Sequence, residues 1–342
     1  MSVRASSAAD DPRLDAFVRE HPHGTFFHLA GWREVVARFS GHTSVVFVAE
    51  ADGAVTGVLP LFSIKSPLLG RALVSSPWAV YGGVIADDPT TAQALVEAAR
   101  GAAEEFNAAY VELRHLHAPG LDLPVNDLYS TYVKDLPDDP DECLTGIPRK
   151  SRASARQARD KHGMTFVEGD EHLDDFYELF VLNKRALGSP VFSLAWFRAL
   201  LERFGDDCVV GAVKHEDTTI AGVVSFIHAG TINPYFSGSK TGTERLGSMN
   251  FMYWKVMETA AARGLKRYDF GRSRNGSGAA KFKVNMGFEP TPLTYQYVLR
   301  GDAEIPSVNP SNPKFDLVKN VWSKLPVSVV KFLGPRLMKG LP

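Results

Sequence analysis

The sequence predicts an α/β (α+β) protein of two tandem domains, each with a mixed central sheet flanked by helices. The chain has 342 residues, 44% of them hydrophobic, and a single core stops growing well before this length. The same order of predicted elements occurs in both halves, which suggests duplication. An acidic, proline-broken segment at 136–141 separates them. We therefore expect domains at 1–145 and 146–300, followed by a tail at 301–342.

The first half opens with a predicted strand pair. Apolar runs at 45–50 and 55–62 flank Asp52-Gly53, a dipeptide typical of tight hairpin turns. Asp88-Pro89 predicts the start of a helix, because aspartate caps helices and proline is favoured at the first helical position. Apolar residues at helical spacing follow, and a strand is expected at 110–113.

The second half repeats this order. Strands are expected at 208–213 and 220–227 around a polar turn, and then at 233–238. A glycine-containing loop, a helix with an apolar face between Met249 and Ala260, and a strand at 267–270 complete the unit. The two halves therefore share one plan, although their residue identity is slight.

Composition narrows the classes of protein to consider. Lysine plus arginine number 38 and aspartate plus glutamate 39, so the chain lacks the net positive charge that would indicate a nucleic-acid-binding protein. Cys143 and Cys208 are too few for a disulfide framework. The histidines lack the spacing of metal ligands, so no metal site is expected. The chain begins without a secretory pattern and no apolar run is long enough to span a bilayer, so we expect a cytoplasmic protein.

The stretch Tyr268–Pro290 resembles the closing part of the catalytic domain in the FemAB family of aminoacyltransferases, and also the BioF-like branch of the GNAT superfamily. The resemblance covers most of residues 25–300: Phe26–Trp32 is similar to the family's opening, Tyr81-Gly82-Gly83 to its first-domain turn, and 148–163 to the start of its second domain. Within the family, the chain resembles FemAB-like proteins associated with exosortase and PEP-CTERM sorting systems. This implies two GNAT-like domains and an acyl- or aminoacyl-transfer activity.

Lys283 is the candidate catalytic residue. It matches the position where Fem ligases carry a lysine implicated in catalysis, so the resemblance implies that it stabilises charge on the acyl carbonyl or on a donor phosphate. Acyl transfer needs such a positive group where the tetrahedral oxyanion develops. Lys281 is the local competitor, and Phe282 between them is a candidate substrate contact. The alternative is that both lysines are solvated residues on a short helix.

Polar residues after the strand at 267–270 are candidates for substrate binding. Asp269, Arg272 and Arg274 lie where open α/β sheets place their ligand loops, and Arg272 is the expected anion contact. The alternative is an Asp–Arg pair that fixes the geometry of the turn. The predicted substrate contacts also include three aromatic residues, Trp32, Tyr81 and Tyr235.

Gly247, Ser248 and Asn250 form the candidate donor loop. The segment is loosely similar to the GNAT loop whose backbone amides cradle the coenzyme A pyrophosphate. Its glycine repeat is incomplete, which weakens coenzyme A as donor, and a helix cap is the alternative role for Ser248 and Asn250. We expect no tightly bound cofactor, and a donor that is either aminoacyl-tRNA or acyl-coenzyme A.

An arginine stripe, made of Arg149, Arg152, Arg156 and Arg159, falls on one face of a predicted helix in a near-neutral protein. It is a candidate phosphate contact. In a Fem-like enzyme it would meet the acceptor stem of aminoacyl-tRNA or a diphosphate-bearing lipid. The alternative is a solvated strap between domains.

The tail is basic and amphipathic. Its apolar residues are interleaved with lysines and an arginine, and Pro326 and Pro335 limit each helix to a few turns. One interpretation places residues 310–342 peripherally on the inner membrane, near a lipid-linked acceptor. The other docks them back onto the first domain.

The leading hypothesis is an N- or O-acyl- or aminoacyl-transferase that modifies a cell-envelope or exopolysaccharide precursor. Its expected partners are a small-molecule or lipid-linked acceptor and, for one of the two donors, tRNA; no pattern defines an oligomeric state. Cell-wall ligases carry a lysine just after the residue matching Trp32, and Val35-Val36 stand there instead, which argues against a peptidoglycan precursor. The rivals are an acetyl-coenzyme A-dependent GNAT enzyme and a non-catalytic recognition module in envelope assembly.

Overall fold

The computed structural model describes residues 1–66, 70–117, 119–306 and 313–342 of the chain. The chain forms two compact units. The first unit comprises Met1–Tyr129, Pro292–Val308 and Leu337–Pro342, and the second comprises Ser130–Thr291 and Asn309–Arg336. Each unit contains a mixed eight-stranded sheet. The predicted α/β architecture with two mixed sheets is confirmed.

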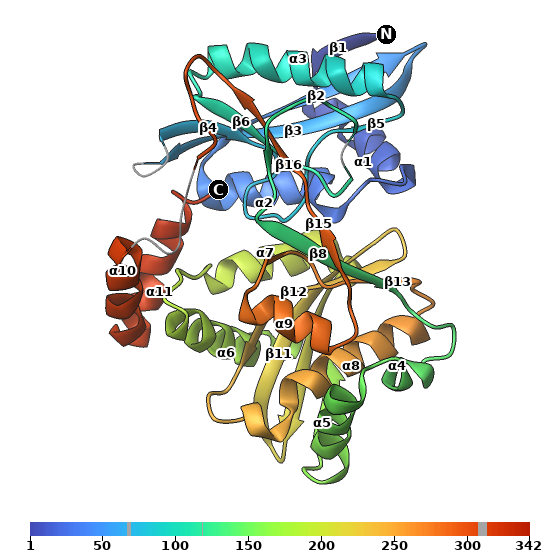
Figure 1. The fold of residues 1–342 in the computed structure, drawn as a ribbon, viewed down its shortest axis with the longest axis vertical. Helices are drawn as coiled ribbons and strands as arrows, with labels where there is room; N and C mark the ends of the chain where they lie inside the picture. The colour runs from blue at the N-terminus through green and yellow to red at the C-terminus, as the bar shows by residue number, and fades with distance from the viewer. Residues whose placement is uncertain (67–69, 118, 307–312) are drawn as a thin grey trace. The chain divides into compact units, whose positions relative to one another are not determined.

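The first unit has seven strands in the spatial order β1-β2-β3-β4-β6-β16-β7, with β5 paired to β3. The neighbours are antiparallel except β4 and β6, which are parallel. Figure 1 shows α3 along one face of this sheet and α1 and α2 on the other. The bounds are β1 (Ser2–Ala5), η1 (Ala8–Asp10), α1 (Asp11–Glu20), η2 (Phe26–His28), α2 (Ala30–Ser40), β2 (Thr43–Ala51), β3 (Ala54–Ser66), β4 (Gly70–Val74), β5 (Ile85–Ala86), α3 (Pro89–Glu105), β6 (Tyr110–Arg114), β7 (Val125–Asn126) and β16 (Tyr295–Leu299).

Local sequence explains the elements that were predicted in this unit. Asp52 and Gly53 adopt φ angles of 50° and 82°, which the tight turn between β2 and β3 requires. Asp88 caps α3 by accepting a hydrogen bond from the Thr91 backbone N–H at 2.9 Å, and Pro89 is the first helical residue. The predicted hairpin, helix and strand at 110–113 are confirmed.

The second unit has the strand order β9-β10-β11-β12-β13-β8-β14, with β15 paired to β8. The hairpin β10–β11, the strand β12, the helix α8 and the strand β13 confirm the predicted order. The bounds are β8 (Tyr129–Asp135), α4 (Glu142–Thr145), α5 (Arg149–Asp160), β9 (Thr165–Glu168), η3 (Asp170–His172), α6 (Leu173–Ala186), α7 (Leu194–Phe204), η4 (Gly205–Asp207), β10 (Cys208–His215), β11 (Thr218–His228), β12 (Thr231–Ser239), η5 (Glu244–Leu246), α8 (Ser248–Ala262), β13 (Arg267–Asp269), β14 (Ser273–Arg274), α9 (Gly278–Asn285), β15 (Pro290–Pro292), α10 (Pro313–Lys324) and α11 (Val327–Met338).

Alternation along β11 explains why helices cover both faces of the second sheet. Val223 packs in one buried cluster with Met252 of α8, whereas Gly222 meets Phe176 of α6 on the other face. Successive residues of a strand point to opposite faces, so a strand buried on both sides is apolar throughout. The continuous apolar run in β11 therefore matches a central position in the sheet.

The two sheets repeat one topology. In each, three antiparallel strands are followed by a helix and a strand parallel to the third: β2, β3, β4, α3 and β6 in the first unit, and β10, β11, β12, α8 and β13 in the second. The next strand is antiparallel in both, but it comes from a distant part of the chain. It is β16 in the first unit and β8 in the second.

Because β8 belongs to the second sheet and β16 to the first, the two units differ from the predicted ranges 1–145, 146–300 and 301–342. The acidic segment after β8 lies inside the second unit: Leu136 is buried and its N–H donates to the Lys266 carbonyl oxygen at 2.8 Å, and Asp138 pairs with the Lys266 ammonium at 2.6 Å. The segment is therefore a connection from β8 to α4, and the division falls before it, at Tyr129.

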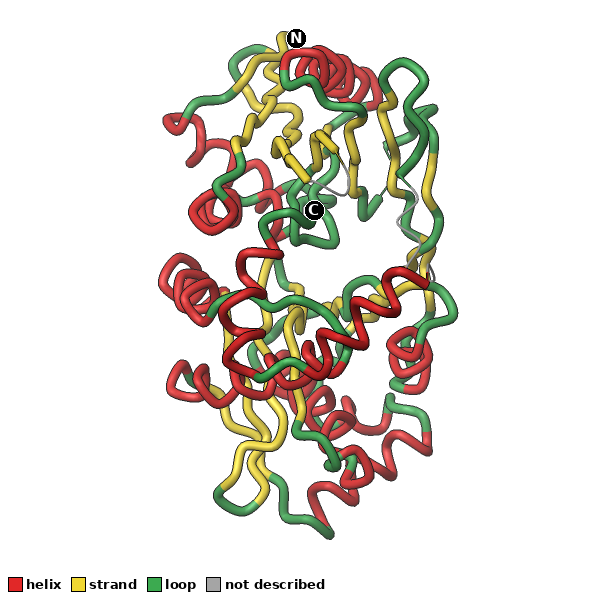
Figure 2. Tube along the Cα trace, turned by 90° about the vertical axis from the view of Figure 1, so that its left-hand side faces the viewer, coloured by secondary structure: helices red, strands yellow, loops and turns green. Residues whose placement is uncertain are grey.

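The C-terminal residues belong to both units. In the second unit, Arg185 of α6 donates to the Leu325 carbonyl oxygen between α10 and α11 at 2.6 Å. In the first unit, the Trp78 indole donates to the carbonyl oxygens of Met338 and Leu341 at 3.1 and 2.9 Å. Figure 1 labels α10 and α11 next to each other, and Figure 2 views the chain from that side. Over the described residues, no helix has the length and apolar character needed to cross a bilayer.

Gly238→Ala should destabilise the second unit by about 1–3 kcal/mol, because an added Cβ would lie 2.5 Å from the Phe180 backbone nitrogen where β12 meets α6. Urea denaturation measures the change. Gly101→Ala is the control, since that α3 glycine has nothing within 4 Å of an added Cβ, and alanine in a helix interior should stabilise. An unchanged midpoint for Gly238→Ala would contradict this packing.

Candidate active site

The parallel pairing between β12 and β13 ends after two residue pairs, Thr231 with Arg267 and Ile232 with Tyr268. The next residue of β12, Asn233, replaces the backbone pairing with its side chain: its Nδ2 donates to the Asp269 carbonyl oxygen at 3.0 Å. The other amide atom, Oδ1, is buried without a hydrogen-bond partner among the described residues. A polar side chain therefore stands where the two strands stop pairing.

A bulge in β12 follows at the same place. Val224 of β11 pairs with Phe236 and Ser225 pairs with Pro234, so Tyr235 is the extra residue of the bulge. Pro234 has no N–H to donate to a ladder. Bulges re-aim side chains and are common beside active sites. The half-buried Tyr235 ring lies near the rings of Phe226 and Phe236, at 5.4 and 4.8 Å between centroids.

The turn after β13 is fixed by Asp269. Its side chain is buried, and Oδ1 accepts a hydrogen bond from the Gly271 N–H at 2.7 Å. Gly271 has φ +65°, a conformation that glycine adopts without steric cost. This contact with a backbone N–H supports the turn-fixing interpretation for Asp269. Arg272 and Arg274 are half-buried in the same loop.

Lys283 reaches back from α9 to this turn. The helix begins after Ser277, whose Oγ accepts from the Ala280 N–H at 3.2 Å. Lys283 is 8% exposed, and its Nζ donates to the carbonyl oxygens of Gly271 and Arg272 at 2.8 and 3.1 Å. Nζ also lies 5.1 Å from the centroid of the Tyr132 ring. The ammonium group is thus held by backbone carbonyls and an aromatic face.

The pKa of Lys283 is lowered to about 7. Burial is the main cause, because it disfavours the charged ammonium group; the Asp269 carboxylate opposes the shift and the Arg272 guanidinium adds to it. Lysine with such a pKa changes its charge near neutral pH. Perturbed groups of this kind are typical of functional sites, although structural networks also produce them.

The two neighbouring candidates occupy different environments. Lys281 is exposed, as expected for a solvated helix residue. Phe282 is half-buried and packs near Tyr253 and Phe270, with ring centroids 5.7 and 6.2 Å apart. The Tyr253 hydroxyl donates to Ser237 Oγ of β12 at 2.9 Å. The structure thus separates Lys283 from its sequence competitor and joins it to a cluster of aromatic rings.

The candidate donor loop lies against α5. Gly247 has φ +76°, and an added Cβ would lie 2.6 Å from the Ser154 carbonyl oxygen, so only glycine fits there. Ser248 is the first residue of α8, and its buried Oγ has no partner within the described part of the chain. Asn250 Nδ2 contacts Met286 Sδ at 3.2 Å. Neither Ser248 nor Asn250 caps the helix, so the capping alternative is wrong.

The arginine stripe lies on α5 beside the face that packs on α8. Arg149 and Arg156 are exposed. Arg152 donates to the Thr145 carbonyl oxygen at 3.0 Å. Arg159 pairs with Asp160 at 2.6 Å and lies 5.3 Å from the Trp254 ring centroid. Part of the stripe thus has structural partners, while its role as a phosphate contact stays a prediction.

Trp32 and Tyr81 lie in the core of the first unit. Trp32 is 0% exposed and packs edge-on to Phe27 at 4.9 Å, and Tyr81 is 2% exposed. Neither side chain presents surface to a substrate in this structure, and core packing accounts for both. Their predicted substrate contacts stay predictions. Sequence patterns did not single out Asn233, although an asparagine directly before a proline within a strand is a local irregularity.

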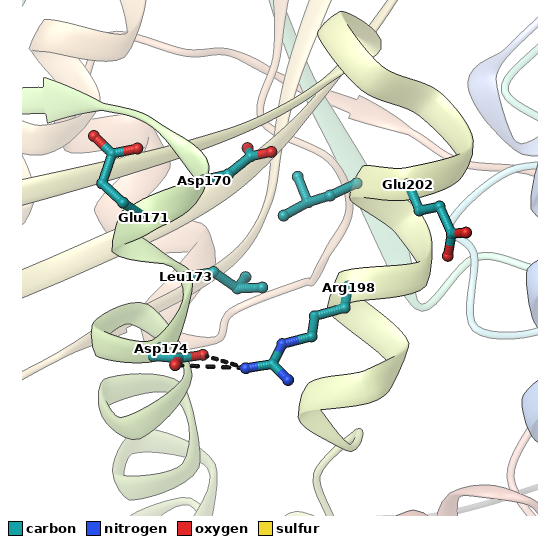
Figure 3. A pocket seen from close by; sticks show the side chains of 7 residues that line it. Asp170, Glu171, Leu173, Asp174, Arg198 and Glu202 are labelled. Carbon is teal, nitrogen blue, oxygen red and sulfur yellow. Dashed lines mark hydrogen bonds and ion pairs between the residues drawn. The ribbon is translucent and has the colours of Figure 1, made fainter.

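A cavity of about 420 Å³ lies in the second unit, and Figure 3 shows the side chains that line it, none of which belongs to the Lys283 turn. Arg198 of α7 points toward Asp174 of α6, and they are 3.1 Å apart. A cavity walled mostly by carboxylates does not suit an anionic donor. Within the described residues no group of three or more potential ligands is arranged for a metal ion. The cavity is lined by Asp170, Glu171, Leu173, Asp174, Arg198, Leu201 and Glu202.

Comparison with known proteins agrees with this description of the second unit. Residues 148–284 match the family model described as an acetyltransferase (GNAT) domain, a segment that includes α8 and most of α9. No curated protein sequence matches the chain. Residues 148–284 of the second unit are therefore similar to a GNAT acetyltransferase domain.

Solved structures share the whole fold. FemX has a TM-score of 0.68 at 16% identity, covering 93% of this chain and 100% of that one. L-PGS from Bacillus licheniformis has a TM-score of 0.51 at 14% identity, covering 92% and 98%. A tandem GNAT protein from the clavulanic acid biosynthesis pathway has a TM-score of 0.53 at 12% identity, covering 89% of this chain and 99% of that one. The chain is thus similar in fold to tandem GNAT proteins, as its resemblance to FemAB proteins implied.

Lys283→Met should remove a pH-dependent part of the stability. The folded-state pKa of about 7 lies below the ordinary value of 10.5, so the unfolded chain binds more protons between these values and the free energy of unfolding rises with pH there. The free energy of unfolding of the wild type, minus that of the variant, should increase by on the order of 2 kcal/mol from pH 7 to pH 9. Urea denaturation at each pH measures it.

The matched control is Lys281→Met, which removes an exposed lysine from another face of the same helix, two residues earlier. Its stability difference from the wild type should not change over the same range. A difference for Lys283→Met that stays constant with pH would contradict a buried lysine with a lowered pKa.

Proposed function

We propose that this chain transfers an acyl or aminoacyl group to an amine or hydroxyl of a cell-envelope or exopolysaccharide precursor. The observation that carries the proposal is Lys283, a buried lysine with a pKa lowered to about 7 within the segment that matches a GNAT domain. It is held at a loop beyond the end of β13, where open sheets bind their ligands. Both facts point to chemistry at this turn.

Lys283 supplies positive charge to the reaction. The acceptor nitrogen or oxygen attacks the acyl carbonyl carbon and the carbonyl electrons move onto oxygen. As the carbonyl re-forms, the bond to the leaving group breaks, and the proton that the acceptor loses ends on the leaving group. An ammonium group has three N–H bonds, and two are directed at the carbonyl oxygens of Gly271 and Arg272. The third is available to an oxyanion or a donor phosphate, whose charge a buried cation stabilises strongly.

The fold comparisons support an envelope acceptor. FemX and the C-terminal domain of a putative lysylphosphatidylglycerol synthetase from Agrobacterium fabrum are similar in fold to this chain, and the sequence resembles FemAB-like proteins associated with exosortase systems. An aminoacyl-tRNA donor is the one that the resemblance to FemAB aminoacyltransferases implies. The exposed arginines Arg149 and Arg156 would meet its phosphates.

A second candidate is acetyl transfer from acetyl-coenzyme A. The matching family model is described as an acetyltransferase, and α8 begins at Ser248, whose buried hydroxyl lacks a partner among the described residues. Helix starts of this kind bind phosphate groups. This candidate uses the same Lys283 and differs in the donor.

Lys283→Met should lower transfer by about 10²–10³-fold, because it removes the cation at the developing oxyanion. The measurement is the recovery of label from a charged donor in an envelope extract incubated with the purified chain. Lys281→Met, at an exposed position on the same helix, should retain wild-type transfer. Equal activity of both variants would contradict the assignment.

The pH dependence of the transfer rate distinguishes two possible roles of Lys283. A cation is present below the pKa of about 7, so transfer that needs the ammonium form falls as pH rises through 7. A general base would instead give a rise through the same pH. Charge stabilisation is the role we propose, and a rising limb that is lost in Lys283→Met would overturn it.

Thermal protection should identify the donor. A ligand at 100 times its Kd stabilises the folded protein by about 2.7 kcal/mol, which raises Tm by roughly 5–10 °C. We expect protection by aminoacyl-tRNA and little by coenzyme A. Arg149→Gln with Arg156→Gln should weaken the tRNA effect and increase its tolerance of salt. Protection by coenzyme A alone would favour the acetyltransferase, and protection by neither would count against both donors.

A further inference from the structure

Exposed large apolar side chains gather at the C-terminal helices of the second unit. On α11, Phe332 and Leu333 are 61% and 36% exposed, and on α10, Val321 is 55% exposed. Leu187, at the end of α6 beside the glycine that contacts α10, is 61% exposed. We call these four residues, with the exposed basic residues Lys324 and Arg336, the C-terminal patch.

On α11, the patch lies on the side of the helix that does not pack against the rest of the second unit. Val330 is 0% exposed, and Gly334 of the same helix is buried so closely that an added Cβ would lie 2.6 Å from Val191. On an α-helix, Phe332 and Arg336 fall on the side opposite these two residues. The Lys331 ammonium pairs with Glu178 of α6. One face therefore anchors α11, and the other carries the exposed apolar groups.

The charge of the segment matches a negatively charged surface. Residues 313–342 contain six basic residues and one acidic residue, in a chain whose basic and acidic residues number 38 and 39. Of the basic residues in the patch, Arg336 lies with its guanidinium carbon 3.8 Å from the centroid of the Phe332 ring. Protein interfaces are depleted in lysine at their cores, whereas basic and apolar residues together are typical of helices that lie in a lipid interface.

We propose that the C-terminal patch binds the surface of a lipid bilayer containing anionic lipids. Phe332, Leu333 and Val321 would enter the boundary between headgroups and acyl chains, and Lys324 and Arg336 would lie among the phosphates. Proline at position 335 and the short α11 fit a helix lying on the surface. The inference does not depend on the transferase activity.

The test is sedimentation of the full chain with vesicles of phosphatidylcholine alone and of phosphatidylcholine with about 30% phosphatidylglycerol, enough to give a strongly negative surface. The wild type should bind the anionic vesicles and not the neutral ones. Phe332→Ser with Leu333→Ser should lower the partition coefficient about tenfold or more. Lys324→Glu with Arg336→Glu should lower it by about fivefold or more for each charge changed.

Two controls match these changes. Leu128→Ser replaces an exposed apolar residue of the first unit, and Lys65→Glu with Arg71→Glu reverses two exposed charges there; both should bind as the wild type does. Equal binding to neutral vesicles, or binding unaffected by either patch variant, overturns the proposal. Loss of self-association in the Phe332 and Leu333 variant, measured by light scattering without any vesicle binding, would assign the patch to a second copy of the chain.

Discussion

A buried ammonium group held by two backbone carbonyls is the constraint around which the candidate site is built. Removing the Lys283 charge from water is costly, and the carbonyl oxygens of Gly271 and Arg272 offset that cost. They point at Nζ because Gly271 adopts a positive φ and because Asp269 holds its N–H. The turn, the start of α9 and the charge of Lys283 are therefore interdependent.

In the first unit, the segment that follows β4 is packed into the core. After β4, the segment from Ser75 to Gly83 is buried throughout, with Ser76 and Trp78 at positive φ angles of 47° and 62°. Arg114 forms a buried ion pair with Glu112 at 2.7 Å and donates to the loop carbonyl of Ala79. Strained backbone persists only where surrounding contacts fix it. In the first unit this segment is therefore fixed by packing and by a buried ion pair.

Sequence patterns predicted the local parts of this structure. Asp52-Gly53 and Asp88-Pro89 define a turn and a helix start through their own backbone preferences, so the local sequence was enough to predict both. The exchange of β8 and β16 was not predictable in this way, because it pairs strands across long stretches of chain. In the sequence, only the family resemblance distinguished Lys283 from Lys281. The burial of Lys283 depends on how α9 packs against the turn at Gly271 and Arg272, which local sequence does not specify. Trp32, an aromatic residue in the same resemblance, turned out to be core.

The C-terminal residues form hydrogen bonds with both units, so deleting them would remove structural contacts as well as the C-terminal patch. Because β16 ends at Leu299, a chain cut near residue 300 would keep the first sheet. It would lose the carbonyl groups of Met338 and Leu341 that accept hydrogen bonds from Trp78, and in the second unit it would lose the bond from Arg185 to Leu325. Buried donors left without partners destabilise a protein by about 1–3 kcal/mol each. A deletion would therefore confuse loss of folding with loss of a binding surface, whereas substitutions on the exposed face of α11 leave these bonds in place.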